Sequence, residues 1–550
     1  MAFLPEQCKL RGLMAHKEKA EVWAPLIFYS LLALGLSVLV LRFQYFIGDD
    51  GYFYARMGEN IIAGRGLSAD GTTPYLDHPP FYSFLIGIFD LFFKDLEFSG
   101  HLVSLLTFSL TVLPLFLVTK EIYSLSSAHW VCLLYATHGF LLIHSGLAMT
   151  ESLFGFLTIA ELYFLNRMIH NDSKPYRLGL LLGISGGLAY LTRPEGSLFY
   201  ASGALAVLLF SNSTISKRRV FFSSLAAFLL CVLPYASFVF QKTGKLPISD
   251  GMKELFIIRQ MDLSHPNRYI ELKKNLHGLS ADKTKIELYR LIEEEFDLWE
   301  YLSKDNFMLL RSFPSSLVNH IEGINRYFFG GLGFLFVGAS WLGAPWDQRR
   351  KKSELVLLLF LATFIPLQLG TFMVRRYLVY LVILLIWMGN GIEIFRRWVE
   401  RSFNTGSARS RTMAVSLCLI FAALSAAYLY RTITNFPMAF ETKELGLWMK
   451  DHISEVEKGP VASRHPAISF YSGTKFLGLP YVDHFDDLSI YMKHYGAKYF
   501  VVSDDLEPPF DESYGPLLDE TKPPPPGMIR RHVVLGRRKV FLYELTGTTK

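Results

Sequence analysis

Long apolar segments separated by short polar loops make up most of the chain up to about residue 431. The first contains 18 consecutive uncharged residues (24–41), which as a helix at about 1.5 Å per residue would span roughly 27 Å, enough to cross a bilayer core. Further apolar segments lie near residues 101–119, 130–147, 152–168, 178–191, 198–211, 220–240, 328–345, 354–372, 377–392 and 413–431. The pattern predicts a polytopic α-helical membrane protein with about 11 transmembrane helices, with residues 80–93 as an additional half-helix or re-entrant piece.

Basic residues gather in alternate loops, which predicts the orientation. They are Lys120; Arg167, Lys174 and Arg177; Lys217, Arg218 and Arg219; Arg349, Arg350, Lys351 and Lys352; and Arg396, Arg397, Arg401, Arg409 and Arg411. Because Lys and Arg in short loops favour the cytoplasmic side, all of these loops and the basic N-terminus are expected there. The loop 43–79, the polar segment 241–327 and the part of the chain from about residue 432 are then expected on the outer side.

The C-terminal part has a different pattern from the apolar segments. Residues 441–453 are predicted to be helical, residues 498–505 to form a buried strand, and residues 531–545 to form a hairpin. The sequence therefore predicts a transmembrane domain over residues 1–431 and a small extracytoplasmic α/β domain over residues 432–550. Within the polar segment, residues 283–302 are also predicted to be helical.

Composition agrees with a membrane protein and excludes other classes. Hydrophobic residues make up 51% of the chain and charged residues only 19%. The formal net charge of +6 is scattered between apolar segments, which fits loops facing anionic lipid and not a nucleic-acid-binding surface. The four cysteines have no metal-ligand spacing, so neither a disulfide framework nor a cysteine zinc site is expected.

Acidic and histidine side chains mark the first outer loop, in GDDGYFYARMGENI (48–61) and YLDHPPFYS (75–83). Asp49 and Asp50 could simply end the first helix at the water boundary. However, adjacent carboxylates repel each other and gain nothing at the C-terminal end of a helix, whereas a base or a cation site would explain them. Asp77 and His78 precede two prolines and could be turn residues, or else His78 could face an anion and Asp77 a metal or a sugar.

Further charged residues are expected at the same outer boundary. Glu151 begins a predicted helix, where it could favour the helix dipole or be another carboxylate of the outer cavity. Arg193, Arg375 and Arg376 oppose the orientation rule, because positive charge is unusual in short outer loops. Guanidinium groups can bind a lipid-linked phosphate bidentately; the structural alternative is contact with lipid headgroups or a pair with Glu195.

Carboxylates and arginines around one outer cavity suit transfer of a sugar from a polyprenyl phosphate. That donor carries its own leaving group, so the enzyme needs cations for the departing phosphate and a carboxylate base for the acceptor, but no general acid. One base opposite the leaving group implies a single displacement with inversion at the anomeric carbon. A divalent cation, Mg²⁺ or Mn²⁺, could bind Asp49, Asp77 and Glu151, although the reaction does not require one.

At these residues the chain resembles the GT-C superfamily of membrane glycosyltransferases, and within it the protein O-mannosyltransferases and lipid A aminoarabinose transferases. That family has an acidic motif ending the first helix, an aromatic-rich amphipathic helix behind it and an acidic element before proline, as in GDDGYFYARMG and YLDHPP. By spacing to Tyr54 and Ala55, Asp50 matches the family's catalytic acid better than Asp49 does. The densest similarity lies in residues 48–200. No repeat-rich sugar-binding domain, such as the eukaryotic members insert, is present in the sequence.

The resemblance implies a bacterial inner-membrane enzyme that moves a monosaccharide from a polyprenyl-phosphate donor to an extracytoplasmic glycan, lipid or protein. Asp50 would be the base, supported by Asp49, Asp77 and Glu151, while His78, Arg193, Arg376 and Arg375 would bind the donor phosphate. Two alternatives remain open: a transporter or flippase of lipid-linked sugar, and a non-catalytic subunit of an envelope-glycan assembly system. A transporter would need polar groups near the bilayer midplane, whereas the charges here gather at the outer edge.

Overall fold

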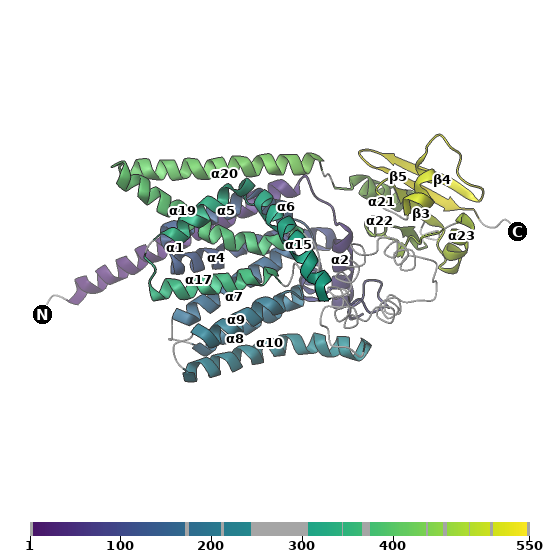
Figure 1. Cartoon of the computed structure of the whole chain (residues 1–550). Coiled ribbons are helices and arrows are strands. Elements are labelled where there is room, and N and C mark those ends of the chain that lie inside the picture. The colour runs from purple at the N-terminus through teal and green to yellow at the C-terminus, as the bar shows by residue number, and fades with distance from the viewer. Residues whose placement is uncertain are drawn as a thin grey trace.

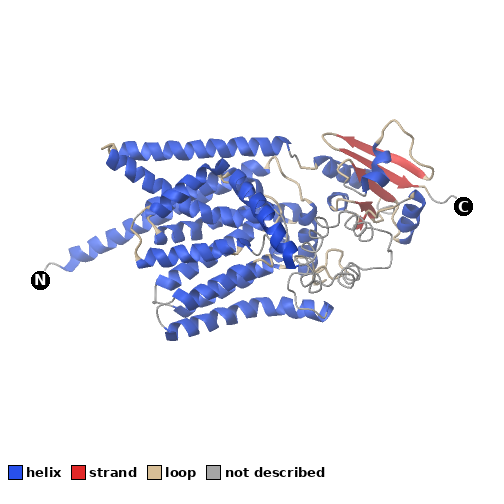
Figure 2. Cartoon of the chain, viewed as in Figure 1, coloured by secondary structure: helices blue, strands red, loops and turns tan. Residues whose placement is uncertain are grey.

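The structure is a computed structural model that describes residues 4–76, 78–170, 175–210, 214–243, 306–343, 345–365, 374–435, 438–454, 459–482, 484–506 and 510–546. A body of helices that run side by side carries, at one end, a smaller part that contains all the strands shown (Figures 1 and 2). The N-terminus lies at the opposite end of the helical body (Figure 1). Asp77 and the predicted helix 283–302 lie outside the described residues.

The helices of the body follow the apolar segments of the sequence, except the helix Asn306–Tyr327, which lies in the polar segment 241–327. They are α1 (Leu4–Leu41), α4 (Leu96–Ile122), α5 (Leu125–Thr137), α6 (Gly139–Ser145), α7 (Glu151–His170), α8 (Pro175–Thr192), α9 (Gly196–Phe210), α10 (Thr214–Thr243), α15 (Asn306–Tyr327), α16 (Leu332–Leu342), α17 (Gln348–Ala362), α19 (Tyr377–Ser402) and α20 (Ser407–Asn435). Two short 3₁₀ turns, η1 (Phe329–Gly331) and η2 (Val374–Arg376), precede α16 and α19.

The structure supports a multi-pass membrane protein. Within the described ranges, six helical segments are long and apolar enough to cross a membrane: Glu21–Leu41, Leu96–Ile122, Glu151–His170, Lys217–Lys242, Val374–Ser402 and Ser407–Asn435. Every predicted apolar segment overlaps a helix, but the segment 130–147 is divided into α5 and α6 at His138, whose backbone is extended. The predicted number of about 11 crossings and the orientation therefore remain predictions.

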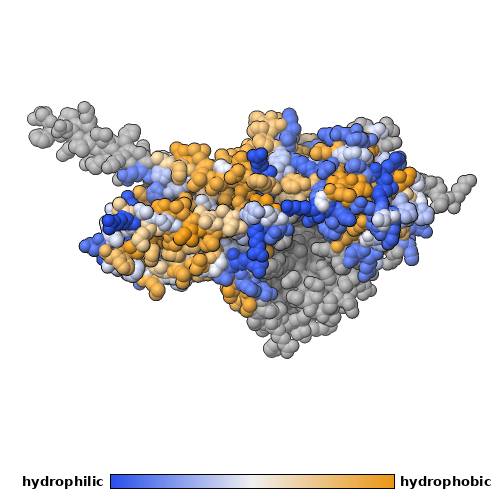
Figure 3. All heavy atoms as spheres, turned by 90° about the horizontal axis from the view of Figure 1, so that it is seen from above, coloured by the Kyte–Doolittle hydropathy of each residue, from blue (hydrophilic) through white to orange (hydrophobic). Residues whose placement is uncertain are grey.

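The surface of the helical body is apolar, as expected for contact with lipid chains. Large hydrophobic side chains are exposed along several of these helices, among them Leu31, Leu230, Leu342 and Leu419. Apolar residues cover much of the helical part in Figure 3, and hydrophilic residues are denser over the C-terminal part. An exposed apolar surface of this extent is typical of membrane contact.

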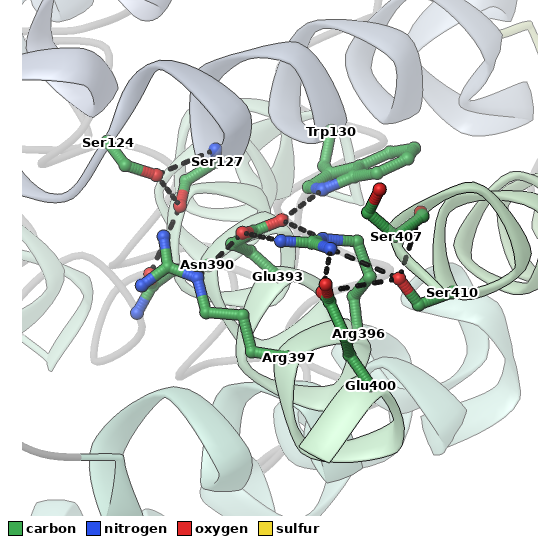
Figure 4. A network of polar contacts seen from close by, with 10 residues as sticks. All are labelled: Ser124, Ser127, Trp130, Asn390, Glu393, Arg396, Arg397, Glu400, Ser407 and Ser410. Carbon is green, nitrogen blue, oxygen red and sulfur yellow. Dashed lines mark hydrogen bonds and ion pairs between the residues drawn. The ribbon is translucent and has the colours of Figure 1, made fainter. Parts of the chain in front are cut away.

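At the end of the body away from the C-terminal part, α19 finishes in a network of ion pairs (Figure 4). Arg396 pairs with Glu393 at 2.9 Å and with Glu400 at 2.7 Å, and Arg397 also pairs with Glu393. Trp130 of α5 donates a hydrogen bond to Glu393 at 3.1 Å. The network pairs Arg396 and Arg397 of the basic cluster with carboxylates and joins α19 to its neighbours.

Two shorter helices at the other end, α2 (Asp49–Ile62) and α3 (Phe81–Phe93), pack closely against each other. A methyl group at Gly58 would lie 2.4 Å from the Ser83 carbonyl oxygen, so glycine is needed for this approach. The expectation that the acidic motif ends the first helix is wrong: α1 ends at Leu41, and Asp49 and Asp50 form the first turn of α2. There they favour the helix dipole, so the pair does gain something from its position.

The C-terminal part is a five-stranded mixed sheet with short helices. Its elements are α21 (Phe440–His452), β1 (Val461–Ser463), α22 (Ala467–Ser472), β2 (Phe476–Gly478), α23 (Phe485–His494), β3 (Tyr499–Ser503), α24 (Phe510–Tyr514), η4 (Gly515–Leu518), β4 (Met528–Leu535) and β5 (Lys539–Leu545). The strand order is β2-β1-β3-β5-β4, with β1 parallel to both its neighbours and β5 antiparallel to both of its own. The predicted helix, strand and hairpin correspond to α21, β3 and β4–β5; the division of the chain at residues 431 and 432 remains a prediction.

Candidate functional site

A pocket with about 320 Å³ of empty space, part of it open to solvent, lies where several helices begin or end near α2. It is lined by Glu151, Phe154, Arg193, Glu195, Phe199, Arg375, Arg376, Leu378, Val379 and Tyr380. The lining combines carboxylates and guanidinium groups with aromatic and aliphatic side chains. Such a pocket can hold a ligand with a charged head and an apolar body.

Helix ends bring the charged side chains together. Glu151 is the first residue of α7, and Arg193 and Glu195 occupy the turn between α8 and α9. Arg375 and Arg376 form η2, directly before α19. The sequence predicted that these charges lie at one membrane boundary, and the structure places them around one pocket.

The inner part of the site is a buried set of ion pairs. Arg193 Nη1 lies 2.8 Å from Glu151 Oε1, and Arg193 Nη2 lies 3.1 Å from Glu195 Oε1. Arg376 Nε is also 3.1 Å from Glu195 Oε1. The Glu151 and Glu195 side chains are only 4% and 6% exposed, so each carboxylate depends on these partners for its charge to be tolerated.

Arg375 links this set to Asp50. Its Nη1 lies 2.6 Å from Asp50 Oδ2, and its Nε lies 3.6 Å from Glu151 Oε1. The charges alternate in sign along Asp50, Arg375, Glu151, Arg193, Glu195 and Arg376, which we call the charge chain. Three carboxylates balance three arginines, and the Asp50 end is the more open, with 32% of that side chain exposed.

The arginines of the charge chain keep Asp50 and Glu195 ionised. Burial raises the pKa of Asp50, but the charges of Arg375 and His78 outweigh it, so this pKa lies below its usual value. Burial also opposes ionisation of Glu195, whose pKa the charges of Arg193 and Arg376 lower to about 2. Asp50 is therefore in the state that a base requires. The His78 ring stacks at a tilt against Tyr54 of α2, with 4.7 Å between the centroids.

One buried acceptor of the site is left without a donor. Glu151 Oε2 has no hydrogen-bond partner among the side chains and backbone that the structure describes. The other oxygen of the same carboxylate is held by Arg193, so the side chain is fixed in place. A buried, unpaired carboxylate oxygen is costly, and in a pocket it is a natural acceptor for a ligand hydroxyl.

Asp49 does not join the charge chain. Its Oδ2 lies 2.9 Å from Nδ1 of His465, a residue of the C-terminal part. Asp77 is outside the described residues, so its predicted role is not addressed. In the described part of the chain no group of three His, Cys, Asp or Glu side chains could hold a metal ion. Asp49 and Glu151 have separate cationic partners, and the predicted cation site, which includes Asp77, remains a prediction.

Two residues of this region were not predicted as members of the site: Glu195 and His465. Glu195 was considered only as a structural partner of the arginines, and the structure shows that it pairs with both Arg193 and Arg376. The motif LTRPEGS contains a signal for it, because an acidic residue two positions after an outer arginine can share its site. His465 has no such signal, since it lies 416 residues from Asp49.

A protein-family model described as dolichyl-phosphate-mannose-protein mannosyltransferase matches residues 77–238. The match covers well under half of the chain, including His78, Glu151 and Arg193. No curated protein matches the sequence significantly.

Several solved structures resemble the chain over most of its length. The archaeal oligosaccharyltransferase AglB from Archaeoglobus fulgidus, in complex with an inhibitory peptide and a dolichol-phosphate, is 15% identical, with a TM-score of 0.57 over 88% of this chain and 69% of that chain. ArnT from Cupriavidus metallidurans in the apo state is 12% identical, with a TM-score of 0.56 over 94% of this chain and 97% of that chain. The arabinofuranosyltransferase AftD from Mycobacteria is 11% identical, with a TM-score of 0.50 over 95% of this chain and 40% of that chain.

Proposed function

We propose, because the chain has the GT-C fold, that it is a membrane glycosyltransferase which moves a monosaccharide from a polyprenyl-phosphate donor to an extracytoplasmic acceptor. The observation that carries the proposal is the charge chain, which joins a carboxylate suited to be a base to a cluster of arginines in one pocket. The acceptor would be a glycan, a lipid or a protein.

The arginines suit the phosphate of the donor. Arg375 is 30% exposed and is the arginine of the charge chain nearest to solvent, with Arg193 and Arg376 behind it. Guanidinium groups bind phosphate oxygens strongly and stabilise the charge that develops on a departing phosphate. Phe154, Phe199 and Leu378 line the same pocket and could contact the first isoprene units of the lipid.

The reaction needs one base and no acid. Asp50 accepts the proton of the acceptor hydroxyl while the oxygen of that hydroxyl forms a bond to the anomeric carbon of the sugar. The bond between that carbon and the phosphate oxygen breaks, and its electron pair leaves with the polyprenyl phosphate. Because the acceptor attacks from the side opposite the leaving group, the configuration at the anomeric carbon inverts.

Arg375 has a further part in this scheme. It pairs with Asp50 at 2.6 Å, and a base held by a guanidinium is a poor proton acceptor. A donor phosphate would compete with Asp50 for Arg375 and so release the carboxylate. Deprotonation of the acceptor would then follow donor binding. The free oxygen of Glu151 is placed to accept a hydrogen bond from a sugar hydroxyl.

The comparisons support the donor class. The description of the matching family names dolichyl-phosphate-mannose, and one ArnT structure is described as bound to undecaprenyl phosphate. Carried over to this chain, they support a lipid-phosphate-linked sugar as donor. A bacterial inner-membrane location with the pocket on the outer side, a cytoplasmic N-terminus and a C-terminal domain outside the cytoplasm belong to the same proposal. No step is assigned to a divalent cation.

The test is sugar transfer by purified protein from synthetic polyprenyl-phosphate sugars to a mixture of candidate acceptors. We expect Asp50→Asn to lower the rate about 100-fold or more, because an amide cannot accept the proton. Glu59→Gln is the matched control: it lies on the same helix, pairs only with the nearby Arg56 and Arg65 among the described residues, and should keep the wild-type rate. Equal rates for Asp50→Asn and wild type would remove Asp50 as the base and point to Asp49 or Glu151.

A further inference from the structure

The C-terminal part is seated on the segment that carries the acidic pair. The Tyr471 hydroxyl accepts a hydrogen bond from the Ile47 backbone amide at 2.9 Å and donates one to Glu97 of α4 at 2.5 Å. Lys443 of α21 donates to Glu97 at 2.9 Å and to the Tyr45 carbonyl at 3.2 Å. These contacts fix the C-terminal part against the chain just before α2.

Apolar packing strengthens this contact between the C-terminal part and the start of α2. Phe46, Ile47 and Ala55, around the start of α2, form one buried cluster with Ala467 and Tyr471 of α22. Burial of such side chains stabilises a contact by about 25 cal/mol per Å² of apolar surface. The two parts therefore share a small core immediately beside Asp49 and Asp50.

The first turn of α2 has no local N-cap that would fix its direction. Gly48, which precedes Asp49, has φ 69° and ψ 170°, a conformation open to glycine but not to other residues. No side-chain hydrogen bond caps the helix at this position. The direction of the first turn, and with it of both carboxylates, therefore depends on contacts with other parts of the chain: the apolar cluster, the pair of Asp50 with Arg375, and the group that binds Asp49.

His465 supplies that contact, from the turn between β1 and α22. Its Nδ1 lies 2.9 Å from Asp49 Oδ2 and its Nε2 lies 2.8 Å from Asp505 Oδ2. Ionised carboxylates only accept hydrogen bonds, so both ring nitrogens must donate and the ring is an imidazolium. Asp505 is itself held by Arg538 and by the Ser503 hydroxyl, which anchors the bridge in the sheet.

We propose that His465 is a positioning residue of the active site, which clamps Asp49 to the C-terminal part and so fixes the first turn of α2 with Asp50 directed at Arg375. The inference rests on the proposed function and assigns the C-terminal part a place in it. Asp49 and Asp50 thus have different roles: Asp49 anchors the turn to the sheet, and Asp50 pairs with Arg375, which lines the pocket. Without the clamp, the two adjacent carboxylates repel each other and the first turn can rotate about Gly48.

The activity test compares His465→Gln, Asp49→Asn and the double variant with wild type in the transfer assay. Each single variant should lower kcat about 10- to 100-fold with little change in the donor KM, because misplacing a reacting group affects turnover more than binding. The double variant should be no worse than either single one, since both remove the same contact. His494→Gln, an exposed histidine of α23, is the control and should behave as wild type.

Wild-type kcat in His465→Gln would overturn the proposal. If Asp49→Asn then lost activity while His465→Gln did not, Asp49 itself would be the base. A second readout needs no catalysis: hydrogen exchange of the backbone amides of residues 52–55, the first of which donates to the Gly48 carbonyl at 3.1 Å. These should exchange faster in His465→Gln than in wild type or His494→Gln. Unchanged exchange contradicts the clamp, whereas faster exchange in a protein that transfers no sugar would uphold the clamp and reject only the proposed function.

Discussion

At the scale of single residues, the site is an alternating row of charges, and most of its members could be predicted from the sequence. Asp50, Glu151, Arg193, Arg375 and Arg376 stand at the ends of apolar segments, where a charge is costly unless it is paired or used. Which carboxylate meets which arginine could not be predicted, because such pairs join residues as far apart as Asp50 and Arg375. His465 could not be predicted at all, since nothing local in the sequence distinguishes it from other surface histidines.

Replacing Arg375 with methionine should affect both the base and the binding of the donor phosphate. The change removes the partner of Asp50 and a cation from the phosphate site, and we expect kcat/KM for the donor to fall about 100-fold or more. The measurement is the initial rate of sugar transfer over a range of donor concentrations. Arg397→Met, at the opposite end of α19, is the control and should be nearly neutral. Equal losses in both variants would indicate a general effect on folding instead.

The pH dependence of stability should report the His465 bridge. Burial opposes protonation, but hydrogen bonds to Asp49 and Asp505 raise the pKa of His465 from 6.5 to about 9, with Arg538 as the next charge beyond Asp505. Because the folded-state pKa is the higher one, the stabilisation is complete below about pH 6.5 and is lost as the pH rises through about 9. The difference in thermal stability between wild type and His465→Gln should narrow over that range. A constant difference from pH 6 to pH 10 would contradict a charged bridge.

At the scale of elements, apolar segments predicted where helices lie but not where they end. The end of α1 at Leu41 agrees with the first apolar segment. Hydropathy records contact with lipid or core and does not mark where α2 begins, so the acidic pair was assigned to the wrong helix end. The break at His138 was hidden in the same way, inside a continuous apolar segment. The order of helices, the helix α21 and the strands β3 to β5 were accessible because their patterns are local.

The contact between α2 and α3 depends on Gly58. A methyl group there would approach the Ser83 carbonyl oxygen to 2.4 Å, so Gly58→Ala must push the helices apart. We expect a loss of about 1–3 kcal/mol in the free energy of unfolding, measured in detergent with a graded denaturant. Gly155→Ala of α7 is the control, because the space around that glycine is open. Equal stability of Gly58→Ala and Gly155→Ala would show that α2 and α3 are not closely packed.

At the scale of the whole molecule, the C-terminal part packs against the end of the helical body that carries the candidate site. Tyr471, Lys443 and His465 all reach from it to the helical body around α2. The sequence predicted a small α/β unit beyond the last apolar segment but assigned it no role, because contacts between distant parts of a chain leave no periodic pattern. The GT-C resemblance is confirmed at the level of the fold. It accounts for the helical body better than for the contacts between the C-terminal part and the chain around α2.

Removing the Tyr471 hydroxyl should weaken the contact between the C-terminal part and the helical body. In Tyr471→Phe the Ile47 amide and the Glu97 carboxylate lose a shared partner in a buried position, so we expect a loss of about 1–3 kcal/mol in stability. The measurement is denaturant unfolding of the purified full-length chain. Tyr430→Phe is the matched control, since that side chain is 73% exposed on α20. A Tyr471→Phe protein as stable as wild type would mean that the hydroxyl does not bridge the two parts.

The most direct test of the central claim is the stoichiometry of a single turnover. Purified wild-type protein would be mixed with synthetic polyprenyl-phosphate sugars and candidate acceptors, and mass spectrometry would count the polyprenyl phosphate released and the sugar transferred. A glycosyltransferase of the proposed kind releases one lipid phosphate for each sugar transferred. In Asp50→Asn, neither lipid phosphate release nor sugar transfer should rise above background. Donor that binds specifically but remains intact in the wild-type protein would contradict the account and indicate a transporter or a binding subunit.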